Sequence, residues 1–196
     1  MEKATRRVVT GHDEAGRAIV LSDGPAPFVH LNEREPEFRS TDVWRTFETP
    51  AVISPSAIEP TLGPRRQLPN PGGTVFRINR IPAETEFTRT MTPEESRGVF
   101  ESLGNREGAT WGIGGRHPLM HRTETVDYAL VLAGSITLIL DDEEIELKSG
   151  DTVVQRGTNH AWANRSGEIC VIAFILIDGC FEGDLKAGRH ANSDNT

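Results

Sequence analysis

The second half of the chain repeats one pattern, a short run of apolar and polar residues, often alternating, that ends at a turn. Gly, Ser, Asn and acidic residues form the turns, and the runs between them cover residues 127–133, 135–140, 144–147, 152–155, 160–164 and 169–177. Short strands at regular spacing with turn chemistry between them are typical of an all-β sandwich or barrel. The last run is apolar at almost every position, which indicates a strand covered on both faces.

The first half of the chain predicts fewer regular elements. Residues 6–10 and 17–22 form two β-rich runs around a polar turn that contains glycine, and this arrangement predicts a hairpin. Residues 42–46 and 74–81 are further predicted strands. Between residues 53 and 73 the chain is rich in Pro and Gly, so we expect an irregular arm that wraps the domain.

One short helix is predicted after residue 91. Thr92 has the position of an N-cap, Pro93 that of the first helical residue, and Glu95 completes a capping box. The helix should end near Gly104.

These elements predict one barrel domain with an extension at each end. We expect residues 1–72 to form an N-terminal hairpin and irregular arm, packed on the barrel or on a partner subunit. Residues 73–183 should form the β-barrel, and residues 184–196 are polar and should be a disordered tail. A chain of 196 residues is long enough to bury a proper core.

Composition narrows the classes of partner. The formal net charge is −8 and no basic run occurs, which argues against a nucleic-acid surface. No apolar stretch has transmembrane length, and the first residues lack the apolar core of a signal peptide. The two cysteines, Cys170 and Cys180, do not resemble a zinc site or a disulfide pair, so we expect reduced thiols. The sequence therefore predicts a cytoplasmic protein that binds a small molecule, with no nucleic acid and no membrane as partner.

Candidate chemistry lies at the start of the run 127–133. His121, Thr123 and Asp127 share parity, so on one continuous strand their side chains would face the same way. Alanines follow on that face, and small residues beside a histidine and a carboxylate suit a cavity better than a core. The opposite face carries larger side chains that we expect to fill the space between the sheets: Tyr128, Leu130 and Leu132.

A matching face is predicted on the run 160–164, where His160, Trp162 and Asn164 alternate. Where two such faces meet inside a barrel, two imidazoles and one carboxylate converge. This set is typical of a metal site with open coordination positions for water, oxygen or substrate. The alternative for each imidazole is an ordinary buried histidine.

The spacing of these residues resembles the two motifs of the cupin superfamily. A glycine, five residues, His121, then Asp127 and, after six more residues, another glycine are similar to the first motif. The segment 150–164, which ends in His-x-x-x-Asn, is similar to the second motif. The resemblance extends over residues 73–178 and implies an all-β fold, a cupin-type jelly-roll β-barrel with the hairpin, the arm and the short helix attached.

In cupins the first motif usually supplies His-x-His and a Glu, and the second motif supplies another His, all of which bind a divalent metal. The resemblance therefore implies that His121, Asp127 and His160 hold a divalent metal ion, with iron, manganese, nickel and zinc as candidates. The sequence departs from the pattern in several ways. Thr123 stands where the second histidine belongs, Asp127 replaces Glu, the segment before His160 is one residue short, and the usual proline there is missing.

The departures leave the roles of single residues open. Asp127 can be a metal ligand, can orient a histidine, or can act as a general base. Thr123 is expected in the catalytic site, where its hydroxyl would contact a metal-bound water or the substrate. Trp162 offers a flat wall to a substrate or packs in the core, and Asn164, which shares its face, is a further residue expected to bind the substrate. Arg156 can grip a substrate carboxylate or form a surface salt bridge.

The motifs are more specific for the fold than for the chemistry. The leading hypothesis is a small cupin enzyme with a divalent metal, acting on a small aromatic or carboxylated metabolite as a dioxygenase, decarboxylase or isomerase. The alternatives are a metal-free isomerase, cyclase or dehydratase that uses acid–base catalysis, and a non-enzymatic binding protein. A homodimer is also expected, because the exposed edges of a short barrel need cover and the hairpin 6–22 can pair across a subunit boundary.

Overall fold

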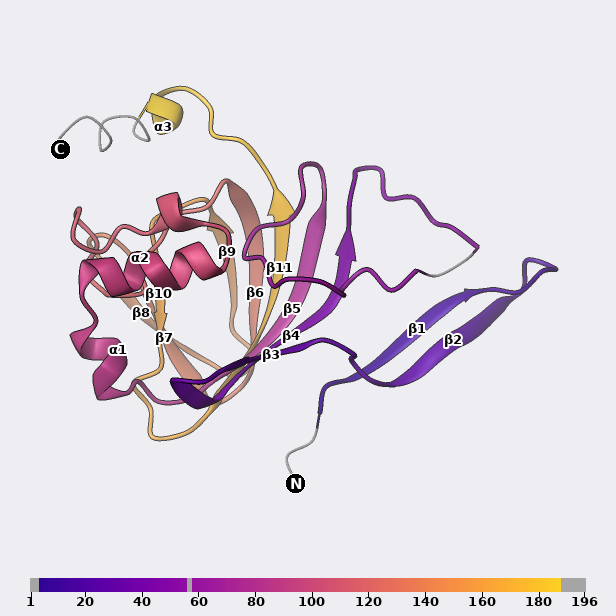
Figure 1. The fold of residues 1–196 in the computed structure, drawn as a ribbon, viewed down its shortest axis with the longest axis horizontal. Helices are drawn as coiled ribbons and strands as arrows, with labels where there is room; N and C mark the ends of the chain where they lie inside the picture. The colour runs from indigo at the N-terminus through magenta and orange to yellow at the C-terminus, as the bar shows by residue number, and fades with distance from the viewer. Residues whose placement is uncertain (1–3, 56–57, 188–196) are drawn as a thin grey trace.

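The computed structural model describes residues 4–55 and 58–187, and it is built around two antiparallel sheets (Figure 1). The larger sheet has the strand order β3-β4-β5-β11-β6-β9, and the smaller one has the order β10-β7-β8. The strands of the larger sheet are β3 (Val29–Asn32), β4 (Glu35–Thr46), β5 (Thr74–Ile81), β11 (Cys170–Asp178), β6 (Thr125–Ala133) and β9 (Thr152–Arg156). Those of the smaller sheet are β10 (Ala161–Ala163), β7 (Ser135–Ile139) and β8 (Glu144–Lys148). The predicted all-β barrel is confirmed.

Apolar side chains from the facing sheets form the core of the barrel. They share a buried position on the inner faces of β5, β6, β7, β8 and β11, and they are Val75, Ala129, Val131, Ile136, Leu138, Leu147, Cys170, Ile172, Phe174 and Leu176. Burying one such large aliphatic or aromatic side chain stabilises the fold by roughly 1.5–3 kcal/mol. Cys170 is a free thiol within this core, as expected for a small apolar side chain, whereas Cys180 is exposed.

Strand β6 shows how sequence parity becomes an inner and an outer face. Thr125, Asp127 and Ala129 are buried on the inner face, as predicted. Tyr128 and Leu130 lie on the opposite face with 48% and 38% of their surface exposed, as does Leu132 with 43%. The expectation that these three side chains fill the space between the sheets is therefore wrong, because the smaller sheet packs only on the inner face.

The predicted helix is α2 (Pro93–Ser102), and its capping box is formed. The hydroxyl of Thr92 accepts from the backbone N–H of Glu95, and the Glu95 carboxylate accepts from the N–H of Thr92. Gly104 follows the helix in the left-handed region with φ of 72°, where glycine carries no steric cost. Three short helical segments were not predicted: α1 (Glu86–Thr90), the 3-10 turn η1 (Arg106–Gly108) and α3 (Asp184–Ala187).

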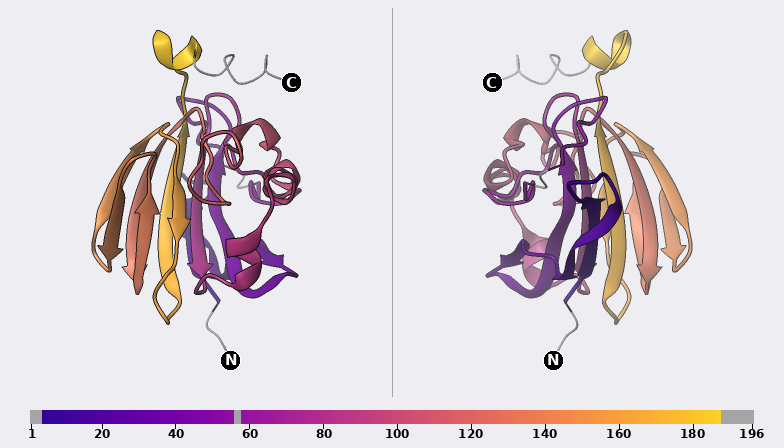
Figure 2. Two further views of the ribbon diagram at one scale, coloured as in Figure 1. Left: turned by 90° about the vertical axis from the view of Figure 1, so that its left-hand side faces the viewer. Right: turned by 90° about the vertical axis from the view of Figure 1, so that its right-hand side faces the viewer.

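Helices α1 and α2 lie on one side of the large curved sheet. Figure 2 shows β6 to β9 at one extreme and the two helices at the other, with β5 and β11 between them. Glu35 of β4 accepts a hydrogen bond of 2.6 Å from Thr88, which ties α1 to the sheet. The hydroxyl of Ser96 in α2 donates to the carbonyl of Pro118, so the helix also supports the loop that leads to β6.

The N-terminal hairpin is present but belongs to neither barrel sheet. Its strands β1 (Arg6–His12) and β2 (Ala18–Pro25) pair only with each other and project from the body of the molecule (Figure 1). Arg7 anchors the hairpin through an ion pair of 2.5 Å with Glu59 and lies 5.6 Å from the ring centre of Trp44. The hairpin therefore does not extend the sheet of its own barrel.

The expected boundary at residue 72 does not separate the arm from the barrel. Strand β4 pairs with β5 along residues 39–46, and β3 pairs with β4, so part of the predicted arm completes the larger sheet. The expected tail lies mostly outside the described residues. Within the described part of the chain, no helix has the length and apolar character needed to cross a membrane.

Candidate functional site in the barrel

Two histidines, His121 and His160, lie next to each other in the barrel. His121 and His160 exchange backbone hydrogen bonds of 2.9 Å in each direction, so their side chains stand next to one another. The ring centroids are 4.3 Å apart with an angle of 50° between the ring planes. The two faces that the sequence predicted to converge therefore do so at these two residues, although His121 precedes β6 instead of lying within it.

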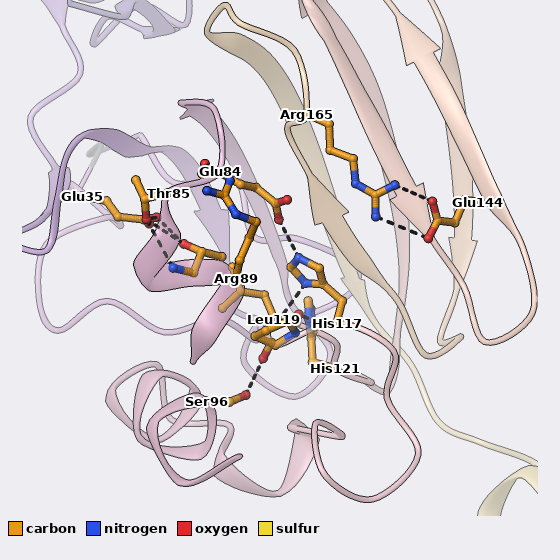
Figure 3. A network of polar contacts seen from close by, with 12 residues as sticks. Glu35, Glu84, Thr85, Arg89, Ser96, His117, Leu119, His121, Glu144 and Arg165 are labelled. Atoms are coloured by element: carbon orange, nitrogen blue, oxygen red, sulfur yellow. Dashed lines mark hydrogen bonds and ion pairs between the residues drawn. The ribbon is translucent and has the colours of Figure 1, made fainter. Parts of the chain in front are cut away.

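Each imidazole is held by a hydrogen bond from its Nδ1 atom to the backbone carbonyl two residues earlier in the chain. The Nδ1 atom of His121 lies 3.0 Å from the carbonyl oxygen of Leu119, and Nδ1 of His160 lies 3.0 Å from that of Thr158. A carbonyl oxygen only accepts, so each ring carries its proton on Nδ1 and leaves the lone pair of Nε2 available. Figure 3 shows the His121 ring and its bond to the Leu119 carbonyl.

Burial keeps both histidines neutral. Burial lowers the pKa of His121 to about 4, against a smaller opposing effect of the Leu119 carbonyl. Burial, together with the neighbouring His121, lowers the pKa of His160 to about 3. Neutral imidazoles with a free Nε2 can accept a hydrogen bond from a substrate or bind a cation.

An aromatic ring lies beside each histidine of the pair. Phe100 of α2 lies 4.8 Å from the ring of His121, and Trp162 lies 6.1 Å from that of His160. Trp162 in turn contacts Phe174 edge to face at 5.2 Å, and it is only partly buried. Trp162 thus packs against the core and still forms a wall beside His160, so both expected roles fit its position.

Asp127 is a buried carboxylic acid on the inner face of β6. One of its oxygens, Oδ1, is buried without a hydrogen-bond partner among the described residues. Burial raises the pKa of Asp127 to about 6, opposed by a hydrogen bond from Thr125 and by the charge of Arg77. The hydroxyl of Thr123 lies 2.8 Å from that of Thr125, so hydroxyl groups connect Thr123 to the acid. This arrangement can hold or release a proton near neutral pH.

The predicted three-residue ligand set is brought together only in part. His121 and His160 are adjacent, but among residues 4–55 and 58–187 no three His, Cys, Asp or Glu side chains are close enough to hold one metal ion. Asp127 lies on the same inner surface of the barrel without joining the pair. The residues present therefore fit two ligands of a metal, with the Nε2 atoms as donors, and leave the third ligand unassigned.

Two other predicted residues lie elsewhere. Arg156 is exposed at the end of β9, where its neighbour Gln155 points inward and donates to the carbonyl of Thr158 at 3.0 Å. Gln155 was missed, although it alternates with the apolar positions of its strand, and it supports the turn that carries His160.

Asn164 is fully buried and saturated by backbone and local contacts. Its amide group donates to the carbonyls of Ile81 and Glu168, and its oxygen accepts from the N–H and the hydroxyl of Ser166. These bonds leave no group of Asn164 for a substrate.

His117, in the loop before β6, also has both ring nitrogens in use. Its Nδ1 accepts from the N–H of Leu119 at 3.1 Å, and its Nε2 contacts Glu84 at 2.5 Å (Figure 3). His117 therefore joins the loops at the end of the barrel and does not join the histidine pair.

A polar cluster on the inner face of β4 and β5 was not predicted at all. Asp42, Arg45 and Arg77 are buried, and both guanidinium groups bind the one carboxylate at 2.6 Å. The signal was present in the strand 74–81, where Arg77 has the parity of the apolar residues that face the core.

Comparison with known proteins finds a family match for the segment that carries both motifs. Residues 110–177 match the family model described as "Cupin domain". A 53-residue segment is 60% identical to the phomopsin biosynthesis cluster protein C' of Diaporthe leptostromiformis and covers 26% of this chain and 28% of that protein. The chain thus spans less than a third of the length of this relative.

A longer but weaker match covers most of the chain. The cupin-domain-containing oxidoreductase fogC of Aspergillus ruber is 26% identical over 181 residues, which cover 88% of this chain and 71% of that protein. Among solved structures, a cupin 2 conserved barrel domain protein from Salinispora arenicola is 9% identical, with a TM-score of 0.38, and the match covers 84% of this chain and 90% of that one.

Proposed function

We propose that the chain, whose residues 110–177 match the cupin domain model, is a cupin enzyme that transforms a small metabolite inside its barrel, with Asp127 as the group that moves a proton. Two neutral imidazoles, His121 and His160, would accept hydrogen bonds from the substrate through their Nε2 atoms. Trp162 would provide an apolar wall beside them.

The observation that carries the proposal is the state of Asp127. A carboxyl group with a buried, unpartnered oxygen and a pKa near 6 exchanges protons readily at physiological pH. A purely structural aspartate in a core is normally saturated by hydrogen bonds or ion pairs. Strong perturbation of a buried titratable group inside a barrel is typical of a functional site.

Several relatives carry the name oxidoreductase, which supports a redox reaction as the reaction type. The matches include fogC of Aspergillus ruber and virC of Hypocrea virens, both described as cupin-domain-containing oxidoreductases. The phomopsin and oryzines relatives belong by name to biosynthesis clusters, so we take a biosynthetic metabolite as the substrate class.

The test uses small-molecule extracts, because no single substrate follows from the site. Purified protein is incubated with a metabolite extract of a strain of the source organism that lacks the gene, and mass spectrometry follows the compounds consumed and formed. We expect wild-type protein to convert at least one compound and Asp127→Asn to convert it at least about a hundredfold more slowly. Conversion at the wild-type rate by Asp127→Asn would remove Asp127 from the reaction.

A divalent metal at the histidine pair is the second candidate, and the backbone anchoring of both Nδ1 atoms favours it. Ligand histidines in proteins typically donate Nδ1–H to a carbonyl or carboxylate, which directs Nε2 to the metal. When bound, such an ion would polarise a substrate oxygen or lower the pKa of a bound water. His121 and His160 would hold it; the motif implies Asp127 as the further ligand, but Asp127 does not lie close enough to the histidine pair in this structure to bind the same ion.

Metal content measures this candidate directly. Protein purified without chelator and incubated with iron, manganese, nickel or zinc should bind close to one ion, and a His121→Ala, His160→Ala double variant should bind none. Wild-type protein that stays empty with all four ions would refute the metal site while leaving the role of Asp127 intact.

We also propose that the protein is a homodimer in which the hairpin of each chain covers the barrel of a second copy. A free two-stranded hairpin is marginally stable in water. In this hairpin Val8 and Val20 are 48% and 59% exposed. A hollow of about 410 Å³ separates β1 from the outer faces of β4 and β5 and is lined by residues 7–10 and by Val43, Trp44 and Phe76.

The outer face of the larger sheet offers the complementary surface. Its exposed apolar side chains lie on the adjacent strands β11, β6 and β9, and they are Tyr128, Leu130, Leu132, Val154 and Ile175. A two-fold arrangement lets the same chain supply both parts, so one symmetric contact would cover the hairpin and the sheet of each copy. Because one chain carries both the hairpin and the complementary sheet face, a second copy of this chain is the partner that we propose for them.

Light scattering on the intact chain tests the dimer. Val20→Glu places a charge on the exposed hairpin and should produce a monomer, whereas Ile113→Glu, in the loop 109–115, should leave the dimer unchanged. A monomeric wild-type protein, or a Val20→Glu variant that stays dimeric, would refute this assembly.

A further inference from the structure

The barrel interior contains more positive charge than its own residues balance. Three guanidinium groups, those of Arg45, Arg65 and Arg77, lie around the single carboxylate of Asp42. Three positive charges against one negative charge leave these four residues with a formal charge of +2, and the nearby carboxyl group of Asp127, when ionised, reduces it to +1. Both oxygens of Asp42 are already taken, one by Arg45 and the other by Arg77, at 2.6 Å each.

Arg65 is the member without an anionic partner among the described residues. Its Nη2 donates to the hydroxyl of Ser40 at 3.2 Å, and its Nε is buried with no hydrogen-bond partner in the same part of the chain. Burial, followed by the charge of Arg77, lowers the pKa of Arg65 to about 9, so the group is still a cation at pH 7. A buried charge without a partner is costly, and binding an anion removes that cost.

Polar groups from three neighbouring strands line up beneath Arg65. His30 of β3 is paired with Ser40 of β4, and Ser40 is paired with Asn79 of β5. The side-chain oxygen of Asn79 is buried without a partner within residues 4–55 and 58–187, and rotation of the amide by 180° would present its NH2 group instead. This row therefore offers an amide, a hydroxyl and an imidazole next to a guanidinium fork.

This row of polar groups is open to solvent at its β3 end. At its β5 end it leads toward the aromatic rings of Phe174 and Trp162. His30 and Arg65 are only partly buried, so solvent reaches the site from the β3 side. Arg77, in the next row, is paired across the sheet with Phe174, whose ring contacts Trp162. A small molecule held at Arg65 thus lies on the same inner surface as the rest of the candidate site.

We propose that Arg65, with Ser40 and Asn79, binds the carboxylate group of a small organic acid. A carboxylate matches the planar fork of a guanidinium group and can accept from the hydroxyl and the amide as well. Arg65 then takes the role that the sequence suggested for Arg156, which is exposed on the outside of the barrel. Only the statement that this acid is the substrate rests on the proposed function, because binding itself needs no turnover.

Titration calorimetry with benzoate tests the site, with benzamide as the neutral analogue and inorganic phosphate as a second anion. We expect benzoate to bind and benzamide to bind at least about tenfold more weakly, because hydrogen bonds to a charged group are the stronger ones. Arg65→Gln should weaken benzoate binding by a similar factor. Arg66→Gln removes the same charge from the adjacent, exposed arginine and should change the affinity less than twofold.

Each contrary result overturns a definite part of the inference. Equal binding of benzoate and benzamide, or equal losses in Arg65→Gln and Arg66→Gln, would show that no carboxylate is held at Arg65. Tighter binding of phosphate than of benzoate would overturn the assignment to carboxylic acids. The melting temperature of Arg65→Gln without ligand controls for folding. We expect it at or above that of wild type, because the variant loses a charge that has no anionic partner. Loss of metal binding or of conversion in the experiments above would leave these titrations unaffected, so the two proposals fail separately.

Discussion

Replacing Asp127 by asparagine should stabilise the protein at neutral pH and have no effect on stability in acid. The native pKa of Asp127 is raised from 3.8 to about 6, mainly by burial. Above pH 6 the folded protein therefore carries a buried negative charge that the unfolded chain carries in water. Asparagine has nearly the same shape and never carries that charge.

The raised pKa fixes both the size of the effect and its pH window. A rise from 3.8 to about 6 corresponds to about 3 kcal/mol of destabilisation of the folded state. Since the folded pKa is the higher one, this penalty is absent below about pH 4, grows between about pH 4 and 6, and is complete above pH 6. For a chain of this length, 3 kcal/mol corresponds to a rise in melting temperature of roughly 6–12 °C.

Thermal unfolding of both proteins at half-unit steps from pH 4 to pH 8 measures this difference. Equal protein concentrations keep any association constant between the two series. The difference in melting temperature should start near zero at pH 4, rise through pH 5 and level off above pH 6. A constant difference across the series, or an asparagine variant that is less stable at pH 8, would refute a buried, partly unsatisfied carboxyl at this position.

Three further predictions use neighbouring side chains. His160 has a depressed native pKa, so its contribution to stability is present above its unfolded pKa near 6.5 and is lost in acid; His160→Gln should reduce the acid loss by about 1.4 kcal/mol per pH unit between pH 6 and 4, measured by urea unfolding. Thr125→Val removes the hydroxyl that bonds to Asp127 and should raise the pKa of that carboxyl above 6, which moves the rise in the previous experiment to higher pH. Asn164→Ala removes a side chain with four hydrogen bonds and should cost about 2–4 kcal/mol of unfolding free energy, with benzoate affinity and metal content unchanged in calorimetry and metal analysis.

The alternation of residues predicted the barrel and one side of its site. The shared parity of Asp127 and Ala129 predicted the inner face of β6. The glycine turn before His160 predicted that this residue would lie close to His121. These features depend on local periodicity and turn chemistry, which a single sequence contains. Which face of the strand the second sheet covers is not local information, and Tyr128 and Leu130 were for that reason assigned to the wrong environment.

The arginine cluster was beyond local reasoning for a different physical reason. The segment that carries Arg65 has no periodicity, and only the fold brings it over β4 and β5. Within β5, however, Val75, Arg77 and Asn79 share parity, and polar side chains at core positions require partners from elsewhere in the chain. The alternation within β5 is therefore a signal for a buried polar site, although it does not identify the residues that complete it.

Thr123 connects the departure from the cupin motif to the chemistry proposed for the barrel. A histidine at this position would add a third imidazole beside His121 and would remove the hydroxyl that contacts Thr125. With threonine, the hydroxyl group of Thr123, just before β6, instead lies beside that of Thr125, and the two lead to an acid with a pKa near 6. Such a row can pass a proton along hydrogen bonds, whereas a ligand histidine would be committed to the metal. The substitution therefore favours proton transfer at Asp127 over a complete motif-type ligand set, and the stability profile of Asp127→Asn and the metal content of the histidine variants measure those two properties independently.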